Sequence, residues 1–286
     1  MSASNSSWMR SPVLRNRSVL LGGGALLLLV LLALFAPLLA GSDPTQVVPR
    51  LRLRAPSAEF LMGTDALGRD VWSRVAYGAR VSLLISAVVA VSSLLIGALL
   101  GMCAGYVRWL DGPIMRTMDG IMAIPGILFA IALVSISGAT IMTVVVAIAL
   151  SEVPRVARLL RGVVLTLREE AFVEAAAGLG SRTGKVMLRH ILPNTVAPLI
   201  VQGTYIFGAA MLAEATLSFL GAGLPPQTPS WGNVIAEGRA VFQRAPWTIF
   251  FPGACLALAV LAVNLMGDGL RDTLDPMMQK RVGGKA

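Results

Sequence analysis

Glu174-Ala-Ala-Ala-Gly-Leu-Gly180, running on to Arg189-His-Ile-Leu-Pro-Asn194, is the one long polar segment between apolar runs long enough to cross a bilayer. Its first half predicts a short helix whose apolar face, at i, i+3, i+4 and i+7, consists of Phe172, Ala175, Ala176 and Leu179. Glu174 falls in an early turn, where the helix dipole favours negative charge. Gly180 supplies the conformational freedom to end that helix and turn.

A second helix is expected after this turn. It carries a basic stripe with spacings of three and four residues, made of Arg182, Lys185 and Arg189. Pro193 is badly placed for the interior of a continuing helix and indicates a break or kink. The segment is therefore predicted to be a helix–turn–helix that projects from a membrane domain, although an ordinary amphipathic loop would show the same spacing.

The segment resembles the signature loop of permease subunits in binding-protein-dependent ABC importers, which reads Glu-Ala-Ala, three residues, Gly, and then an Ile-x-Leu-Pro ending. The matching residues are Glu174, Ala175, Ala176, Gly180, Leu192 and Pro193. His190 stands where that family has Ile, but Arg189-His-Ile-Leu-Pro-Asn194 is similar to the peptide-importer version. In that family the loop docks on a separate ATPase subunit, so the resemblance implies this coupling role for the whole segment, including Phe172, Leu179, Arg182 and Lys185.

The composition predicts a polytopic membrane protein. Of the 286 residues, 56% are hydrophobic and 14% are charged, with a mean hydropathy of +0.75, whereas soluble domains carry about 25% charged residues. We assign the net charge of +9 to cytoplasmic loops rather than to nucleic-acid binding. Cys103 and Cys255 lie inside apolar runs, and His190 is the only histidine, so no metal site and no cofactor are expected.

Six transmembrane helices are expected, at Val19–Ala40, 81–107, Thr117–Ser137, Thr140–Leu160, 191–213 and 245–267. The uncharged stretch 120–151 is too long for one straight span of a hydrocarbon core of about 30 Å. We divide it into a hairpin, because a single span would place the basic loop that follows it outside the cell. Pro125 and Pro154 should kink or bound these helices.

The predicted organisation is an N-terminal cytoplasmic segment 1–18, a permease domain 19–276 with its loop at 161–190, and a cytoplasmic tail 277–286. Both termini and the loop are placed inside, and 41–80 and 225–246 outside, which puts the larger share of Lys and Arg on the inner side. A short interfacial helix that carries Val71 and Val75 is expected before the second span.

Further segments resemble the peptide and nickel permeases of this family. They are Gly63-Thr-Asp-Ala-Leu-Gly-Arg-Asp70, Leu217–Pro226, Ser230-Trp-Gly232 and Asn264–Pro276. The carboxylates of the first could suggest a metal site, but helix caps and ion pairs with Arg69 and Arg74 are the favoured explanation.

Two features lie inside the spans. Gly97, Gly101 and Gly105 share one helix face, which predicts close packing against another helix, within the domain or on a partner. Glu214 is a carboxylate in an apolar span, which indicates a functional residue by default. Substrate contact on the translocation pathway, a gating role and a structural role near the outer end stay open for it.

The resemblance implies an all-α protein with the type I ABC importer permease fold, in the bacterial cytoplasmic membrane. It implies import of di- or oligopeptides, together with a second homologous permease, two ATPase subunits, an extracytoplasmic binding protein and membrane lipid. Nickel, glutathione and other small solutes use closely similar permeases.

The chain itself is not expected to be an enzyme. Gly180-Ser-Arg-Thr-Gly-Lys-Val186 has three residues between its glycines where a phosphate-binding loop has four, and Val186 lacks the required hydroxyl. Two rival classes are a proton-coupled secondary transporter centred on Glu214, which the polar loop disfavours, and a membrane-embedded enzyme, for which no convergent catalytic group is found.

Overall fold

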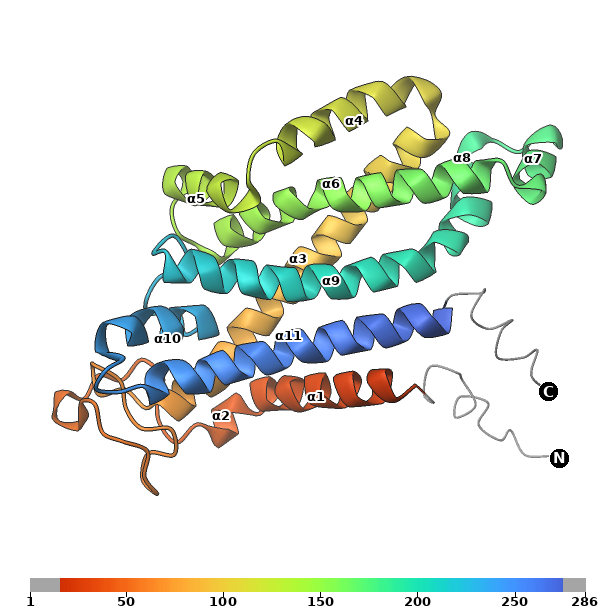
Figure 1. Cartoon of the computed structure of the whole chain (residues 1–286). Coiled ribbons are helices and arrows are strands. Elements are labelled where there is room, and N and C mark those ends of the chain that lie inside the picture. Colours follow the sequence, from red (N-terminus) through yellow and green to blue (C-terminus); the bar gives the residue numbers. More distant parts are fainter. Residues whose placement is uncertain (1–15, 275–286) are drawn as a thin grey trace, which may run out of the picture.

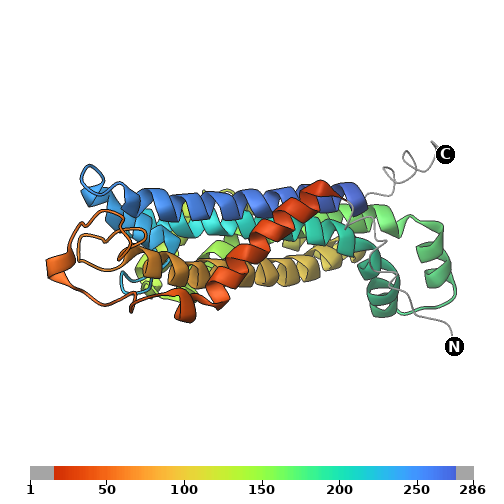
Figure 2. The same cartoon turned by 90° about the horizontal axis from the view of Figure 1, so that it is seen from below.

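The computed structural model describes residues 16–274, and this part of the chain is helical with no strand, apart from an isolated bridge between Thr64 and Asp70. Figure 1 shows the long helices side by side, with α3 running obliquely behind α6, α9 and α11. Irregular loops gather at one end of the bundle, and α7 and α8 project from the other (Figure 2). The predicted N-terminal segment lies almost wholly, and the predicted tail wholly, outside the described residues.

The helices fall into three groups. The long ones are α1 (Arg17–Leu34), α3 (Val71–Tyr106), α6 (Ile141–Arg168), α9 (Leu192–Phe219) and α11 (Trp247–Leu274). The shorter ones are α2 (Ala36–Leu39), α4 (Arg108–Met122), α5 (Gly126–Ser137), α7 (Ala171–Gly178), α8 (Thr183–Val186) and α10 (Trp231–Gly238). Single turns occur at η3 (Pro49–Leu51), η5 (Arg239–Val241) and the π-helical turn Met187–Ile191.

The prediction of a separate interfacial helix before the second span is wrong. Asp70 caps the N-terminus of α3 by accepting a hydrogen bond from the Ser73 backbone N–H at 3.0 Å, and one helix then continues to Tyr106. Val71 and Val75 are fully buried and pack against Trp231, so they do not lie at a lipid surface. Tertiary packing therefore turned an expected surface helix into the first turns of a span.

Gly97, Gly101 and Gly105 lie where α3 packs along α6. A methyl group on Gly101 would stand 2.5 Å from the carbonyl oxygen of Ala157, and one on Gly97 or Gly105 would collide with Val156 or Val164. The partner of this glycine face is therefore a helix of the same chain. Small residues permit such close backbone approach in membranes, where van der Waals packing drives helix association.

The third predicted span, Thr117–Ser137, is broken. α4 and α5 meet at an angle of 85°, with Ala123–Pro125 between them. Pro125 stands at the N-cap of α5, as its expected role in bounding a helix requires. Pro154, in contrast, lies inside α6, which continues through it.

Within residues 16–274, four helical runs are long and apolar enough to cross a membrane, namely α1, α3, Thr183–Phe219 and α11, and the bent α4–α5 pair would make a fifth. The segment expected to be the fourth span is α6, whose apolar half ends at Ser151 and is followed by Glu152, Arg155 and Arg158. α6 nevertheless packs against α3, which crosses it obliquely in Figure 1. An all-α membrane domain is confirmed, and a count of six spans stays a prediction.

Replacing Gly101 by alanine should destabilise the protein by about 1–3 kcal/mol, because the added methyl group forces α3 and α6 apart. Gly23→Ala is the matched control: no atom lies within 4 Å of its added methyl group, and alanine favours a helix over glycine by about 1 kcal/mol. Thermal unfolding of the purified chain in detergent, followed by tryptophan fluorescence, measures both. A Tm for Gly101→Ala at or above that of Gly23→Ala would contradict this account of the seam.

Candidate functional site

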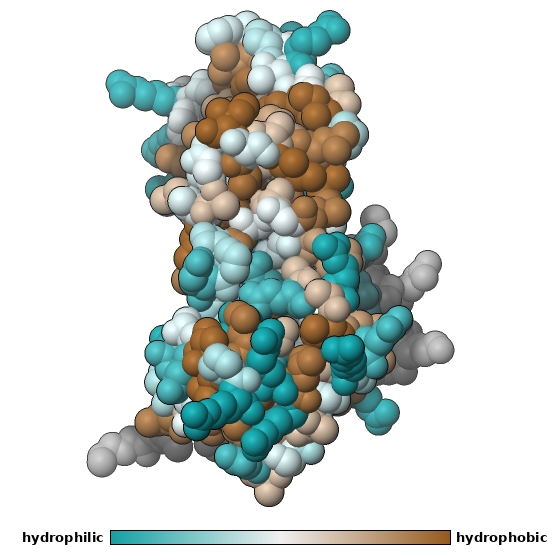
Figure 3. Space-filling view, turned by 90° about the vertical axis from the view of Figure 1, so that its left-hand side faces the viewer, coloured by the Kyte–Doolittle hydropathy of each residue, from teal (hydrophilic) through white to brown (hydrophobic). Residues whose placement is uncertain are grey.

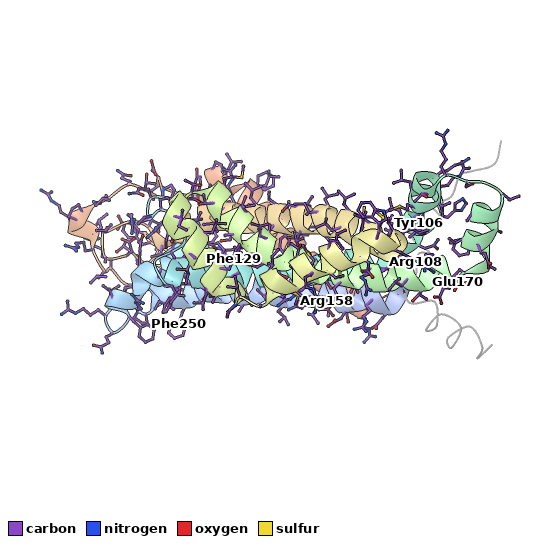
Figure 4. All side chains as sticks on the ribbon, turned by 90° about the horizontal axis from the view of Figure 1, so that it is seen from above. Tyr106, Arg108, Phe129, Arg158, Glu170 and Phe250 are labelled. Carbon is purple, nitrogen blue, oxygen red and sulfur yellow. The ribbon has the colours of Figure 1, made fainter. Side chains whose placement is uncertain are left out.

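The polar segment of the sequence forms a helical projection between α6 and α9. α6 continues to Arg168, so the projection begins later than the expected residue 161 and comprises α7, α8 and the turn between them. Figures 1 and 2 place it at the end of the bundle where α1 begins and α11 ends. Figure 4 shows Tyr106, Arg108 and Glu170 close to this end, and Phe250 at the opposite one.

α7 ends in a turn at Gly180, as the sequence predicts. Gly180 has a φ of +81°, in the left-handed region that favours glycine. Its N–H donates to the carbonyl oxygen of Ala177 at 2.9 Å, and that of Ser181 donates to Ala176 at 3.2 Å. These two bonds form a Schellman motif, which satisfies the last carbonyl groups of the helix. Glu174 lies in the first turn, as expected.

The predicted apolar face of α7 is divided between two surfaces. Ala176 and Val173 are both buried, and Val173 belongs to a cluster with Val186 and Ile191 of the same chain. Ala175 is exposed, and Phe172 and Leu179 are 44% and 88% exposed. The assignment of Ala176 to the exposed face is therefore wrong, because α7 needs one side to pack against its own domain.

The second helix, α8, is shorter than expected, and a π-helical turn follows it. Arg182, Lys185 and Arg189 are all exposed, but Arg189 belongs to the π-helical turn that links α8 to α9. Pro193 then stands in the first turn of α9, where a missing N–H costs little. Leu192 is half-buried and packs against the Val173 cluster. The chain thus passes Pro193 without the predicted break.

A cavity of about 410 Å³ lies between α7 and the C-terminal ends of α3 and α6. It is lined by Tyr106, Arg168, Glu169, Val173, Glu174 and Ala177. One wall carries Arg168 and the other carries Glu174, so both charges border the same hollow. A partner's side chain entering here would meet an aromatic ring and charges of both signs.

Glu214 is 1% exposed and holds three elements together at the other end of the bundle. It accepts hydrogen bonds from the hydroxyl groups of Ser218 at 2.9 Å, Ser230 at 2.8 Å and Ser82 at 3.5 Å. Ser230 also caps α10 by accepting a bond from the Asn233 N–H at 3.1 Å. The carboxylate therefore ties α9 to α3 and α10.

The carboxylates of the Gly63–Asp70 segment take part in ion pairs and a cap. Asp65 accepts hydrogen bonds from Arg69 Nε at 2.6 Å and from Arg74 Nη1 at 2.8 Å. Arg74 also donates to Glu237 of α10 at 2.6 Å, and Asp70 caps α3. Between Asn16 and Leu274 no cluster of His, Cys, Asp and Glu has a metal-binding arrangement. Figure 3 views this end of the molecule, with hydrophilic side chains gathered in its lower part and hydrophobic ones above.

The sequence analysis did not single out one charged pair, Glu152 and Arg155, within the segment that it expected to be the fourth span. Glu152 and Arg155 lie on consecutive turns of α6, with Arg155 Nη1 at 3.2 Å from both carboxylate oxygens. The signal for it is a carboxylate followed by a guanidinium at i+3, directly after the apolar half of the helix.

Comparison with known proteins shows the family. Residues 93–280 match the binding-protein-dependent transport system inner membrane component. Residues 10–56 match the N-terminal transmembrane domain of oligopeptide transport permease C.

Several curated relatives match nearly the whole chain. A probable peptide ABC transporter permease protein of Sinorhizobium fredii is 53% identical, covering 93% of this chain and 91% of its own length. A dipeptide transport system permease protein of Alkalihalophilus pseudofirmus is 44% identical, covering 93% of this chain and 88% of its own length. A glutathione transport system permease protein of Pectobacterium atrosepticum is 39% identical, covering 95% of this chain and 90% of its own length.

Gly180→Ala should loosen the α7–α8 turn, because the left-handed conformation costs a residue with a Cβ about 1–2 kcal/mol. Gly178→Ala is the control, since Gly178 is a helical residue with no atom within 4 Å of an added methyl group. Hydrogen exchange of the α7 amides should accelerate about tenfold in Gly180→Ala and stay level or slow down in Gly178→Ala. Equal protection in the two variants would contradict the role of Gly180.

Proposed function

The chain belongs to the inner membrane components of binding-protein-dependent transport systems, and from this membership we propose that it is the permease subunit of an ATP-driven importer of di- and oligopeptides. It forms half of the translocation pathway and couples to a separate ATPase through α7 and the turn after it. Its spans cross the bacterial cytoplasmic membrane, with the α7 projection and both termini on the cytoplasmic side.

The observation that supports this coupling role is the exposed side of α7. Phe172 and Leu179 extend apolar surface from a projection that carries Arg182, Lys185 and Arg189 nearby. Apolar groups on a polar projection gain stability when another protein covers them. An amphipathic helix inserted into a groove of a partner is a common form of recognition. An ATPase subunit is the partner that the family's signature loop implies.

The remaining partners follow from the family. A second homologous permease completes the pathway, two ATPase subunits supply energy, and an external binding protein delivers the peptide. ATP-driven closure of the ATPases moves the two α7 projections, and the spans then alternate between outward and inward access. This chain hydrolyses no ATP in this scheme, because its phosphate-loop look-alike at Gly180–Val186 is one residue short.

Peptide is the favoured substrate. Relatives named for peptide and dipeptide transport are 53% and 44% identical to this chain, against 39% for the relative named for glutathione. Glutathione is itself a small peptide, so this second candidate has the same chemical character. A nickel ion is a third candidate within the family, and no relative described above is named for it.

A proton-coupled mechanism centred on Glu214 is less favoured. The carboxylate is buried among serine hydroxyl groups of three elements and supports the N-terminus of α10. We therefore propose that Glu214 stabilises the outer closure of the bundle and acts as part of a gate, not as a proton carrier.

Leu179→Asp should leave the domain folded and abolish ATPase docking, since Leu179 is 88% exposed and lies away from the buried cluster. The matched control is Leu61→Asp, an equally drastic change at a leucine that is 62% exposed in the outer loop. When the subunits are co-expressed, co-purification of the ATPase should fall about tenfold for Leu179→Asp and stay unchanged for Leu61→Asp. Full co-purification with Leu179→Asp would refute docking through α7.

The proposed orientation predicts the labelling of single cysteines. Cys103 and Cys255 are first replaced by alanine, and a cysteine is then placed at Ser57 in the outer loop or at Ser181 in the α7–α8 turn. An impermeant maleimide should label Ser57→Cys in intact cells or spheroplasts, and Ser181→Cys only after the membrane is opened. Labelling of Ser181→Cys from outside would reverse the proposed topology.

A further inference from the structure

Glu152 lies close to mid-depth in the transmembrane bundle. The hydroxyl group of Ser93, near the middle of the uncharged stretch 81–107 of α3, donates to the carbonyl oxygen of Ala149 at 3.3 Å. Glu152 follows Ala149 by less than one turn on α6, and Arg155 lies one turn further toward the α7 end. Ionised side chains at this depth face the interior of a bundle or a water-filled passage rather than lipid, because their transfer into hydrocarbon is costly.

Both charged groups border a cavity of about 230 Å³ between α5, α6 and α9. α5 contributes Gly126 and Ala130 at the break between α4 and α5, and α9 contributes Leu217. The remaining walls are mostly small or aliphatic side chains. The cavity therefore offers one carboxylate and one guanidinium in otherwise apolar surroundings.

The hydrogen bonds between Glu152 and Arg155 are long. One nitrogen of Arg155 is 3.2 Å from each Glu152 oxygen, longer than the roughly 2.7–2.9 Å of strong charge-assisted bonds. By contrast, Arg161 clasps Asp111 with two bonds of 2.5 and 2.6 Å, and Arg158 binds Asp119 at 2.8 Å. The Glu152 side chain is 12% exposed and that of Arg155 is 59% exposed, so the guanidinium has donors free for another acceptor.

We propose that this cavity is a contact point for the two charged ends of a short peptide during translocation, an inference that rests on the proposed function. Glu152 accepts hydrogen bonds from the peptide's ammonium group, and Arg155 donates to its carboxylate. The pair separates to admit the peptide and closes again behind it.

Charge balance favours such a ligand over a bare ion. The empty cavity is neutral because its two charges compensate each other. A zwitterionic peptide brings one charge of each sign, so the loaded cavity is neutral as well and both Glu152 and Arg155 keep an oppositely charged partner. A divalent cation would leave the loaded cavity with a net positive charge at mid-depth, which is unfavourable there.

Recognition of the two charged termini would also make binding largely independent of the peptide's sequence. The side chains of a bound peptide would meet only small or aliphatic groups such as Ala130 and Leu217. Apolar contacts of this kind discriminate weakly between side chains that differ by a methylene group or two. The site would thus suit a transporter that moves many short peptides.

The test uses the complete transporter in proteoliposomes, consisting of this chain, the second permease, the ATPases and the binding protein loaded with dialanine. Dialanine uptake and ATP hydrolysis are measured together for Glu152→Gln, Arg155→Gln and the control Arg116→Gln, an exposed arginine on α4 outside the cavity. We expect peptide uptake per ATP to fall about tenfold in both cavity variants, with ATP hydrolysis within about twofold of the parent. The control should match the parent in both measurements.

Three results would overturn the proposal while leaving the proposed function intact. The first is unchanged peptide uptake per ATP in both cavity variants. The second is a proportional fall of uptake and ATP hydrolysis, which would indicate a structural role. The third is a loss of uptake per ATP in only one variant, which would rule out recognition of both peptide ends. If the parent transporter takes up no dialanine, the proposed substrate fails, and this proposal fails with it.

Discussion

The close approach of α3 and α6 at Gly97, Gly101 and Gly105 is the contact on which the rest of the structure depends. The glycines leave room for the side chains of Val156, Leu160 and Val164 on α6, so the two helices pack closely and the depth of the residues on α6 is set relative to α3. That register places Glu152 beside the middle of α3 and carries the end of α6 beyond the bundle, where α7 follows. The internal cavity and the external projection are thus consequences of one packed seam.

Charged groups inside this chain are stabilised in three different ways. Glu214 is surrounded by serine hydroxyl groups, which satisfy a carboxylate without an opposite charge. Asp65 is held by Arg69 and Arg74 in a network that joins the outer loop to α3 and α10. The third arrangement is the ion pair between Glu152 and Arg155, in which one guanidinium nitrogen lies 3.2 Å from both carboxylate oxygens and both side chains border a cavity.

The errors of the sequence analysis share a physical cause. Periodicity describes one helix at a time, so it could not reveal that Val71 and Val75 pack against Trp231 and continue into α3. It could not divide the surface of α7 either, because the side of α7 that packs against the domain is set by the contact of Val173 with residues beyond the turn, such as Val186 and Ile191. Pro125 marked the end of a helix correctly, but the 85° bend there depends on how α4 and α5 pack against α6.

The sequence by itself determined the class of protein, the polar projection and the turn at Gly180. These depend on local hydropathy, spacing and backbone freedom, which are properties of neighbouring residues. Only the tertiary structure decided which surfaces of the projection are free, that the glycine face meets α6, and that Glu214 is enclosed by serine residues from three elements. Those outcomes depend on contacts between residues 16 to 132 positions apart. Contacts over such separations form only when the helices pack together, so no local pattern encodes them.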